Sequence, residues 1–325
     1  TEGHARYGDG CDAVVFGHTW PRFGNTEVKK FIRLQRDNYK FIHDQTLRMA
    51  NMGMSAHEIA AAIKPPKALA DEWSTHGYYG TYKHNVRGVF QYYIGWWDGN
   101  PAHLDPLPPV EQAKRYVELA GAQKLFAAAK KAFDRGEYRW AAEVLSHLVF
   151  ADAANTRAKS LLADSYEQMG YQSESGNMRN IYLVAPAELR GKPPYNNWLG
   201  SPDLVNSMST ASFMDLLATR LNPEKIGERA MTFVFDITDT KEAARVDVEN
   251  AVLIAHVGAA GKFSADKADV KLTTTRGQLM GLFLQQAPLA QMQAAGLKAE
   301  GDIDKLLALQ TAIEKPPTDF AVVTP

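Results

Sequence analysis

The stretch GEYRWAAEVLSHLVFADAANTRAKSLLADSYEQMG, from Gly136 to Gly170, decides much of the fold expected for this chain. Its two glycines are 34 residues apart, and an alanine-rich helical pattern followed by a short polar turn lies between them. This spacing is typical of tetratricopeptide-type helical hairpins, in which we expect each glycine to end a helix. About one and a half repeats can be read, and roughly three are needed for a free-standing solenoid. We therefore expect a helical bundle with repeat-like packing.

Helical periodicity continues on the N-terminal side of this stretch, back to about Thr26. We expect Asn25 or Thr26 to cap the first long helix and Gly53 to end it. The tetrapeptide SAHE, Ser55–Glu58, forms a capping box for a second, short helix. Residues 31–200 are therefore predicted to form an all-α domain.

On the C-terminal side, the pattern changes after a segment rich in proline, glycine and asparagine, residues 189–209. Alternating and β-branched residues in 231–240, 242–258 and 269–283 predict strands. We expect residues 205–325 to form a separate α+β domain with antiparallel strands and helices on one face. The whole chain is thus predicted to be a multidomain α+β protein.

The N-terminal residues carry a different pattern. VVFGHTWPRFGN, Val14–Asn25, runs three apolar residues into a glycine and then places His18 at the tip of a predicted buried strand. A strand buried on both faces needs neighbouring strands, and residues 1–25 supply one strand with no sheet to join. We therefore expect residues 1–30 to be the end of a larger domain, and the chain to be the later part of a longer polypeptide.

Composition argues against several classes of protein. The net charge of -1 gives no electrostatic footprint for nucleic acid or for an anionic membrane surface. A single cysteine, Cys11, excludes an internal disulfide. No apolar run is long enough to predict a membrane span. We expect neither nucleic acid nor a membrane-spanning segment.

His18 is a candidate metal ligand. Gly17 lets the chain leave the predicted strand tightly and Pro21 stiffens the residues after it, so the imidazole is expected to be held rigidly. The alternative is a hydrogen-bonded turn residue, which spacing alone favours because a lone histidine is weak evidence for metal. The other histidines form no metal-binding motif, and no complete catalytic constellation is present, so the catalytic residues are left unknown.

Two further segments each allow two interpretations. HGYYGTYKHNVRGVFQYYIGWW, residues 76–97, concentrates hydroxyls, an imidazole, an amide and a guanidinium that could bind an oxyanion. Aromatic residues at helical spacing equally indicate a core or a subunit interface. LMGLFLQQAPLAQMQAAG, residues 279–296, could line an adaptable apolar cavity, although filling a core is the favoured interpretation.

The order of three segments carries a family resemblance. GHTWPRFGN (17–25), RDNYKFIHDQTLRMANMGMSAHEIA (36–60) and HGYYGTYKHNVRGVFQYYIGWWDGNPA (76–102), followed by the repeat-like helices, resemble the bacterial zinc-dependent alkyl sulfatases. That family belongs to the metallo-β-lactamase superfamily, and the resemblance covers essentially the whole chain. It implies the end of an αββα metallo-β-lactamase-type catalytic domain, a helical dimerisation domain with tetratricopeptide-like hairpins, and an α+β domain like sterol carrier protein.

The resemblance also suggests site residues. In that family a histidine in a His-His-Trp-Pro context is a ligand of a two-zinc cluster. His18 matches the first histidine, and Thr19 stands in place of the second. Most of the other ligands belong to a His-x-His-x-Asp-His motif, together with acidic residues, and this sequence lacks them. Tyr79, His84 and Asn85 lie in the matching turn and are candidates for contact with the substrate sulfate; which of them reaches it is left open.

The function implied by the resemblance is zinc-dependent hydrolysis of alkyl sulfate esters, such as dodecyl sulfate, to alcohol and sulfate. The full-length enzyme would be a homodimer with two zinc ions, and this chain alone is expected to be inactive. A periplasmic or secreted location is implied. Two alternatives stay open: a non-catalytic module for dimerisation and for binding lipid or another aliphatic ligand, and a tetratricopeptide-like adaptor.

Overall fold

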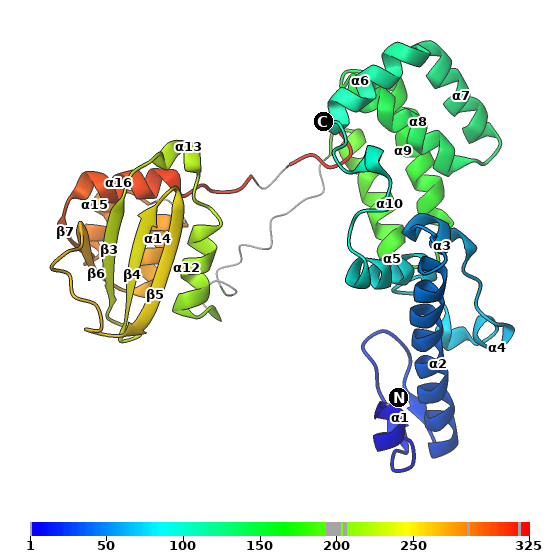
Figure 1. Cartoon of the computed structure of the whole chain (residues 1–325), viewed down its shortest axis with the longest axis horizontal. Helices are drawn as coiled ribbons and strands as arrows, with labels where there is room; N and C mark the ends of the chain where they lie inside the picture. The colour runs from blue at the N-terminus through cyan, green and yellow to red at the C-terminus, as the bar shows by residue number, and fades with distance from the viewer. Residues whose placement is uncertain (1, 193–202, 204–206, 285–286, 318–319) are drawn as a thin grey trace. The chain divides into compact units, whose positions relative to one another are not determined.

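The computed structural model describes residues 2–192, 203, 207–284, 287–317 and 320–325. The chain divides into two compact units, residues 1–194 with 321–325, and residues 195–320 (Figure 1). Residues 1–30 thus belong to the same unit as the helices that come after them. No helix in the described ranges is long and apolar enough to cross a membrane.

The N-terminal segment forms a small hairpin instead of the predicted buried strand. After helix α1 (Glu2–Tyr7), the two-residue strands β1 (Ala13–Val14) and β2 (Arg22–Phe23) pair antiparallel. Val15 and Phe16 are exposed, so the prediction of a buried strand is wrong. An isolated two-stranded pair buries little apolar surface, and no other strand in the described residues joins this one.

Helix α2 (Asn25–Ala50) opens the helical part of the first unit. Gly24 occupies its N-cap position without a side-chain hydrogen bond, so the predicted caps are wrong: the Asn25 amide donates instead to the carbonyls of Gly8 and Cys11. Past the end of α2, Gly53 has the left-handed φ of 86° expected of a residue just after a helix.

The predicted capping box is confirmed. The Ser55 hydroxyl accepts from the Glu58 N–H, and the Glu58 carboxylate accepts from the Ser55 N–H at 2.8 Å, at the start of α3 (Ala56–Ala62). Helices α2, α3 and α5 (Tyr82–Tyr93) enclose a small core. Short elements lie between and after them: α4 (Lys67–Ala70), η1 (Trp73–Thr75) and η2 (Pro101–His103).

Five helices come next: α6 (Pro109–Ala120), α7 (Ala122–Asp134), α8 (Tyr138–Ala151), α9 (Thr156–Tyr171) and α10 (Gly176–Leu189). α8 packs against α6, α7 and α9, and α9 packs against α10. Leu145, Leu148 and Leu162 are fully buried where these helices meet. The predicted bundle of paired helices is confirmed.

The two glycines of the 34-residue spacing have different roles. Gly136 comes after α7 with a φ of 77°, as predicted. Gly170 is the next-to-last residue of α9, so the helix ends beside it as predicted, but it lacks the positive φ of Gly136. A Cβ atom on Gly170 would come within 2.7 Å of a methyl carbon of Leu183 on α10. Glycine is needed there because the two helices approach each other closely.

The second unit contains a five-stranded sheet in the order β5-β4-β3-β6-β7. Its strands are β3 (Met231–Ile237), β4 (Glu242–Glu249), β5 (Val252–Ala259), β6 (Val270–Thr274) and β7 (Lys298–Gly301). β3 and β6 are parallel, so the prediction of antiparallel strands throughout is wrong. Residues 260–269 carry the chain back across the sheet, and β6 therefore runs in the same direction as β3. The strand predicted over 269–283 is also only partly right, because it ends at Thr274 and residues 276–283 form a helix.

Helices supply the core of this unit: α12 (Thr210–Ala218), α13 (Pro223–Ile226), α14 (Arg276–Phe283), α15 (Leu289–Ala294) and α16 (Ile303–Ala312) (Figure 1). Alternate side chains of β3, including Phe233 and Phe235, pack with Phe213 of α12 and Leu306 of α16. Leu279 and Leu282, from the segment that could have lined a cavity, are fully buried in the same core. Residues 279–283 of that segment therefore fill the core, whereas residues 293–296 are exposed.

Candidate functional site

The structure brings two of the predicted site residues into contact. His18 lies on the loop between β1 and β2, and Tyr79 lies on the turn before α5. Their rings stack with centroids 4.1 Å apart and an interplanar angle of 17°. Both side chains are exposed at the surface of the first unit.

A cleft of about 600 Å³ opens beside this stack. Its lining residues are Gly17, His18, Thr19, Trp20, Trp73 and Tyr78. The two indoles and the phenol give it aromatic walls that suit an apolar group. The Thr19 hydroxyl oxygen is buried and has no hydrogen-bond partner in the described residues. The cleft thus combines apolar walls with an imidazole at its edge, and the unpartnered Thr19 hydroxyl lies buried in its wall.

The other two predicted residues occupy the first turn of α5. The His84 N–H donates to the Thr81 hydroxyl, which caps the helix. The Asn85 side-chain oxygen lies 2.8 Å from the position that a Cβ on Gly80 would take, so the turn passes close to this amide. The ring contacts and hydrogen bonds of the described residues join neither His84 nor Asn85 to His18.

The donor set of this chain does not fit a zinc centre on its own. No group of three or more His, Cys, Asp or Glu side chains in the described ranges is placed to hold a metal ion. His18 is therefore a single candidate ligand, and structural and catalytic zinc sites use three or four protein ligands. No chemical step is assigned to zinc from this chain alone.

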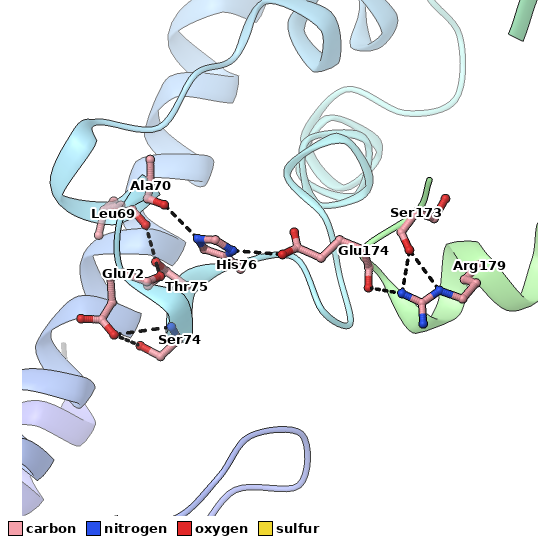
Figure 2. Close-up of polar contacts among 9 residues, drawn as sticks. All are labelled: Leu69, Ala70, Glu72, Ser74, Thr75, His76, Ser173, Glu174 and Arg179. Atoms are coloured by element: carbon pink, nitrogen blue, oxygen red, sulfur yellow. Dashed lines mark hydrogen bonds and ion pairs between the residues drawn. The ribbon is translucent and has the colours of Figure 1, made fainter. Parts of the chain in front are cut away.

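A buried polar segment holds the stretch of chain that leads to Tyr78. Ser74 and Thr75 are both buried. The Ser74 carbonyl accepts from the Gln35 amide of α2 at 2.6 Å, and the Ser74 hydroxyl donates to the Glu72 carboxylate at 3.1 Å. The Thr75 hydroxyl donates to the Leu69 carbonyl (Figure 2). These bonds satisfy buried polar atoms within one short segment and fix its path.

The turn that carries the tyrosines is also bound to the loop between α9 and α10. The Gly176 N–H donates to the Tyr78 carbonyl at 2.8 Å, and the Ser175 hydroxyl donates to the Tyr79 carbonyl at 2.6 Å. Ser175 is buried and caps α10, where it accepts from the Met178 N–H. The sequence shows a serine before this helix, but no local pattern identifies the turn as its partner.

Sequence reasoning missed the ion pair beside these bonds. His76 Nδ1 lies 3.0 Å from a Glu174 carboxylate oxygen, and His76 Nε2 lies 2.9 Å from the Ala70 carbonyl oxygen (Figure 2). The hydrogen bond to Glu174, and then the one to the Ala70 carbonyl, raise the pKa of His76 above its ordinary value. The partners are 98 residues apart, so no local signal in the sequence joins them.

Two protein-family models match the chain. The model described as alkyl sulfatase dimerisation matches residues 55–192, and the model described as alkyl sulfatase C-terminal matches residues 199–325. Together they cover most of the chain. They meet near the boundary between the two compact units.

Named relatives agree with these models. The chain is 41% identical over 324 residues to a linear primary-alkylsulfatase of Pseudomonas sp., covering 98% of this chain and 47% of the relative. It is 38% identical to the alkyl/aryl-sulfatase BDS1 of Saccharomyces cerevisiae, covering 98% and 49%. The chain thus spans about half the length of these relatives.

A solved structure is similar as well. The stereoselective inverting sec-alkylsulfatase Pisa1 from Pseudomonas sp. matches with a TM-score of 0.92 and 36% identity, covering 100% of this chain and 51% of that one. Sequence models, relatives and structure therefore agree with each other. The chain belongs to the alkyl sulfatase family.

Proposed function

We propose that this chain is part of an enzyme that hydrolyses alkyl sulfate esters to an alcohol and sulfate. The observation that carries the proposal is the stack of His18 on Tyr79 at the edge of the aromatic cleft. It places a candidate metal ligand and a phenol beside apolar walls, and an alkyl sulfate has both an anionic head and an apolar chain. Relatives named as alkylsulfatases support the same reaction class.

The cleft residues divide into two proposed roles. Trp20, Trp73 and Tyr78 form aromatic walls against which the alkyl chain packs. The Tyr79 hydroxyl donates a hydrogen bond to a sulfate oxygen. His84 and Asn85, one helical turn further along the chain, are proposed to add donors from α5.

Zinc enters the proposal through His18 alone. When bound, two zinc ions would supply a hydroxide at neutral pH and offset the negative charge of the sulfate. His18 is proposed as one ligand, and the remaining ligands are proposed to come from residues that this 325-residue sequence does not contain. This chain's own residues then bind and orient the ester and shield it from water.

Assembly and location are further parts of the proposal. Because residues 55–192 match an alkyl sulfatase dimerisation model, we propose a homodimer formed through the helical unit. Light scattering of the purified protein tests this, and a monomer at all concentrations would contradict it. A periplasmic or secreted location is proposed, and cell fractionation tests it.

The activity is tested on a full-length protein that contains this chain. Wild type, His18→Ala and His57→Ala are compared for sulfate release from dodecyl sulfate and for zinc content by mass spectrometry. His57 is an exposed histidine on α3 and serves as the control. We expect His18→Ala to lose zinc and to slow sulfate release by more than about 100-fold, because metal sites are sensitive to changes at and around their ligands. Equal activity of all three proteins would overturn the role of His18, and no sulfate release from wild type would overturn the function.

A further inference from the structure

His76 is held between two hydrogen-bond acceptors. Its Nδ1 faces the Glu174 carboxylate at 3.0 Å, and its Nε2 faces the Ala70 carbonyl at 2.9 Å (Figure 2). A carbonyl oxygen and an ionised carboxylate only accept, so both ring nitrogens must donate. A neutral imidazole carries one N–H and would leave the other nitrogen facing a lone pair. The geometry therefore favours the doubly protonated imidazolium.

The charges around His76 favour that form. Glu174 lies on the α9–α10 loop, and Glu72, in the segment before η1, adds a weaker attraction. Lys30 of α2 pairs with Glu72 at 3.4 Å and moderates it. The Tyr78 ring lies 5.8 Å from the imidazole, and no cation faces His76 closely among the contacts of the described residues. The hydrogen bonds to the Glu174 carboxylate and the Ala70 carbonyl stabilise the second ring proton of His76.

The loop that carries Glu174 is itself fixed. The Arg179 guanidinium of α10 donates to the Ser173 carbonyl at 2.8 and 3.1 Å and to the Glu174 carbonyl at 3.3 Å (Figure 2). The Ser173 hydroxyl donates to the Met169 carbonyl at 2.7 Å, which ties the loop to the end of α9. Hydrogen bonds thus join the loop to both α9 and α10.

This support holds the turn that lines the candidate site. The Gly176 N–H and the Ser175 hydroxyl bind the carbonyls of Tyr78 and Tyr79. Tyr78 also lines the His18 cleft. A second cleft of about 410 Å³ is lined by Gly77, Thr81 and residues of the α9–α10 loop. The turn thus borders two clefts, and its two carbonyls are bound by the loop.

We propose that Glu174 and Ser175 are positioning residues for the His18 cleft: while His76 is doubly protonated they hold the Tyr78–Tyr79 turn against His18, and loss of the proton releases the turn. The inference deepens the proposed function, because it concerns the same cleft, and it rests on that function only for the cleft's role in binding substrate. The stack of Tyr79 on His18 is the feature that reports the state of the turn.

The test uses nuclear magnetic resonance of the whole 325-residue chain with labelled histidine and tyrosine, without added metal. His76→Gln assigns the imidazole signal of His76. Two quantities are followed from about pH 5.5 to about pH 9, the range in which a histidine titrates: the His76 signal, and the nuclear Overhauser cross-peak between the rings of His18 and Tyr79. Tyr79→Leu identifies that cross-peak by removing it.

We expect the cross-peak to weaken with the same midpoint as the deprotonation of His76. Glu174→Gln moves this midpoint to lower pH, and His76→Gln weakens the cross-peak over the whole range. Ser175→Ala weakens it at every pH and moves the His76 midpoint less than Glu174→Gln does, since the hydroxyl binds the turn and reaches the imidazole only through the coupling. Asp98→Asn, which alters a comparable pair with His103, serves as the control and leaves both quantities unchanged.

A cross-peak that is constant across the titration and unaffected by Glu174→Gln, Ser175→Ala or His76→Gln would overturn the proposal. Thermal melting of each variant identifies one that fails to fold, and the remaining variants still decide the outcome. Because neither zinc nor substrate is present, this result is independent of the sulfate-release assay. Either proposal can therefore fail without the other.

Discussion

The carboxylate of Glu188, near the end of α10, accepts hydrogen bonds at 3.0 and 3.1 Å from the backbone N–H of Val322, 134 residues further along the chain. The same carboxylate accepts from the N–H groups of Val323 and Thr324 and from the Thr324 hydroxyl. One side chain thus binds the C-terminal tail to the helical unit. The polypeptide that forms the second unit leaves the first unit and returns to it.

This relationship predicts the effect of removing the carboxylate. Glu188→Ala removes the acceptor of these tail hydrogen bonds. A hydrogen bond to a charged group contributes at most about 1.5–3 kcal/mol, and less when it is exposed, so the tail should open more often. We expect amide exchange of residues 321–325 to accelerate at least several-fold, as measured by mass spectrometry. Glu111→Ala, which removes a carboxylate paired with Arg115 on α6, is the control. Unchanged exchange in Glu188→Ala would show that the tail is held by other contacts.

Gly170 gives a second prediction. A Cβ atom there would press on Leu183 across the α9–α10 contact, whereas a Cβ on Gly88 of α5 would meet nothing within 4 Å. We expect Gly170→Ala to destabilise the chain by about 1–3 kcal/mol through overpacking. Gly88→Ala should stabilise it by about 0.5–1 kcal/mol, because alanine loses less backbone entropy in a helix. Thermal melting compares the two, and equal effects would contradict the close packing of α9 on α10.

The isolated 325-residue chain gives a third prediction. Since the described residues bring no three metal-ligating side chains together, we expect this chain to bind less than stoichiometric zinc and to release no sulfate from dodecyl sulfate. Mass spectrometry of the dialysed protein and a sulfate assay measure these quantities. Tight binding of two zinc ions, or sulfate release by this chain alone, would contradict the proposal that its zinc site is incomplete.

The pH dependence of stability is a fourth prediction. The pKa of His76 is raised in the folded chain above its ordinary value of 6.5 by its bonds to Glu174 and the Ala70 carbonyl. The pair therefore stabilises the fold fully below pH 6.5, and this stabilisation is lost as pH rises through the raised pKa. Both side chains are more than one third exposed, so the effect is under about 1 kcal/mol.

Melting curves of wild type and His76→Gln at several pH values test this sign. We expect wild type to melt at most about 2–4 °C higher at mildly acidic pH, with the difference vanishing at alkaline pH. His57→Gln, which alters an exposed histidine on α3, should show no such trend. A difference that grows as pH rises would contradict the assigned protonation state.

Sequence patterns predicted structure correctly where the interacting residues are close together in the chain. The capping box of Ser55 and Glu58 spans four residues, and both partners are visible in the sequence. Gly136 ends its helix as the spacing predicts, and the alternation in residues 231–240 gives strand β3. The family resemblance was carried by long motifs and is confirmed by both family models.

Predictions failed where a distant neighbour decides the outcome. Gly170 was expected to be there for the turn, but it has no positive φ, and α10 packs on it and requires its lack of a side chain. Val15 and Phe16 look like part of a buried strand, but the described residues supply no sheet to cover them. The sequence does not show which strand β6 pairs with, so it could not show that β6 runs parallel to β3.

The sequence by itself determined most of the helices, the main strands of the second unit, the family and the candidate residue His18, because each rests on short-range periodicity or on a contiguous motif. Only the tertiary structure decided that His18 stacks on Tyr79 and that His76 pairs with Glu174. Such pairs form when separate elements pack together, and the free energy that selects them comes from burial and hydrogen bonding between segments far apart in the chain.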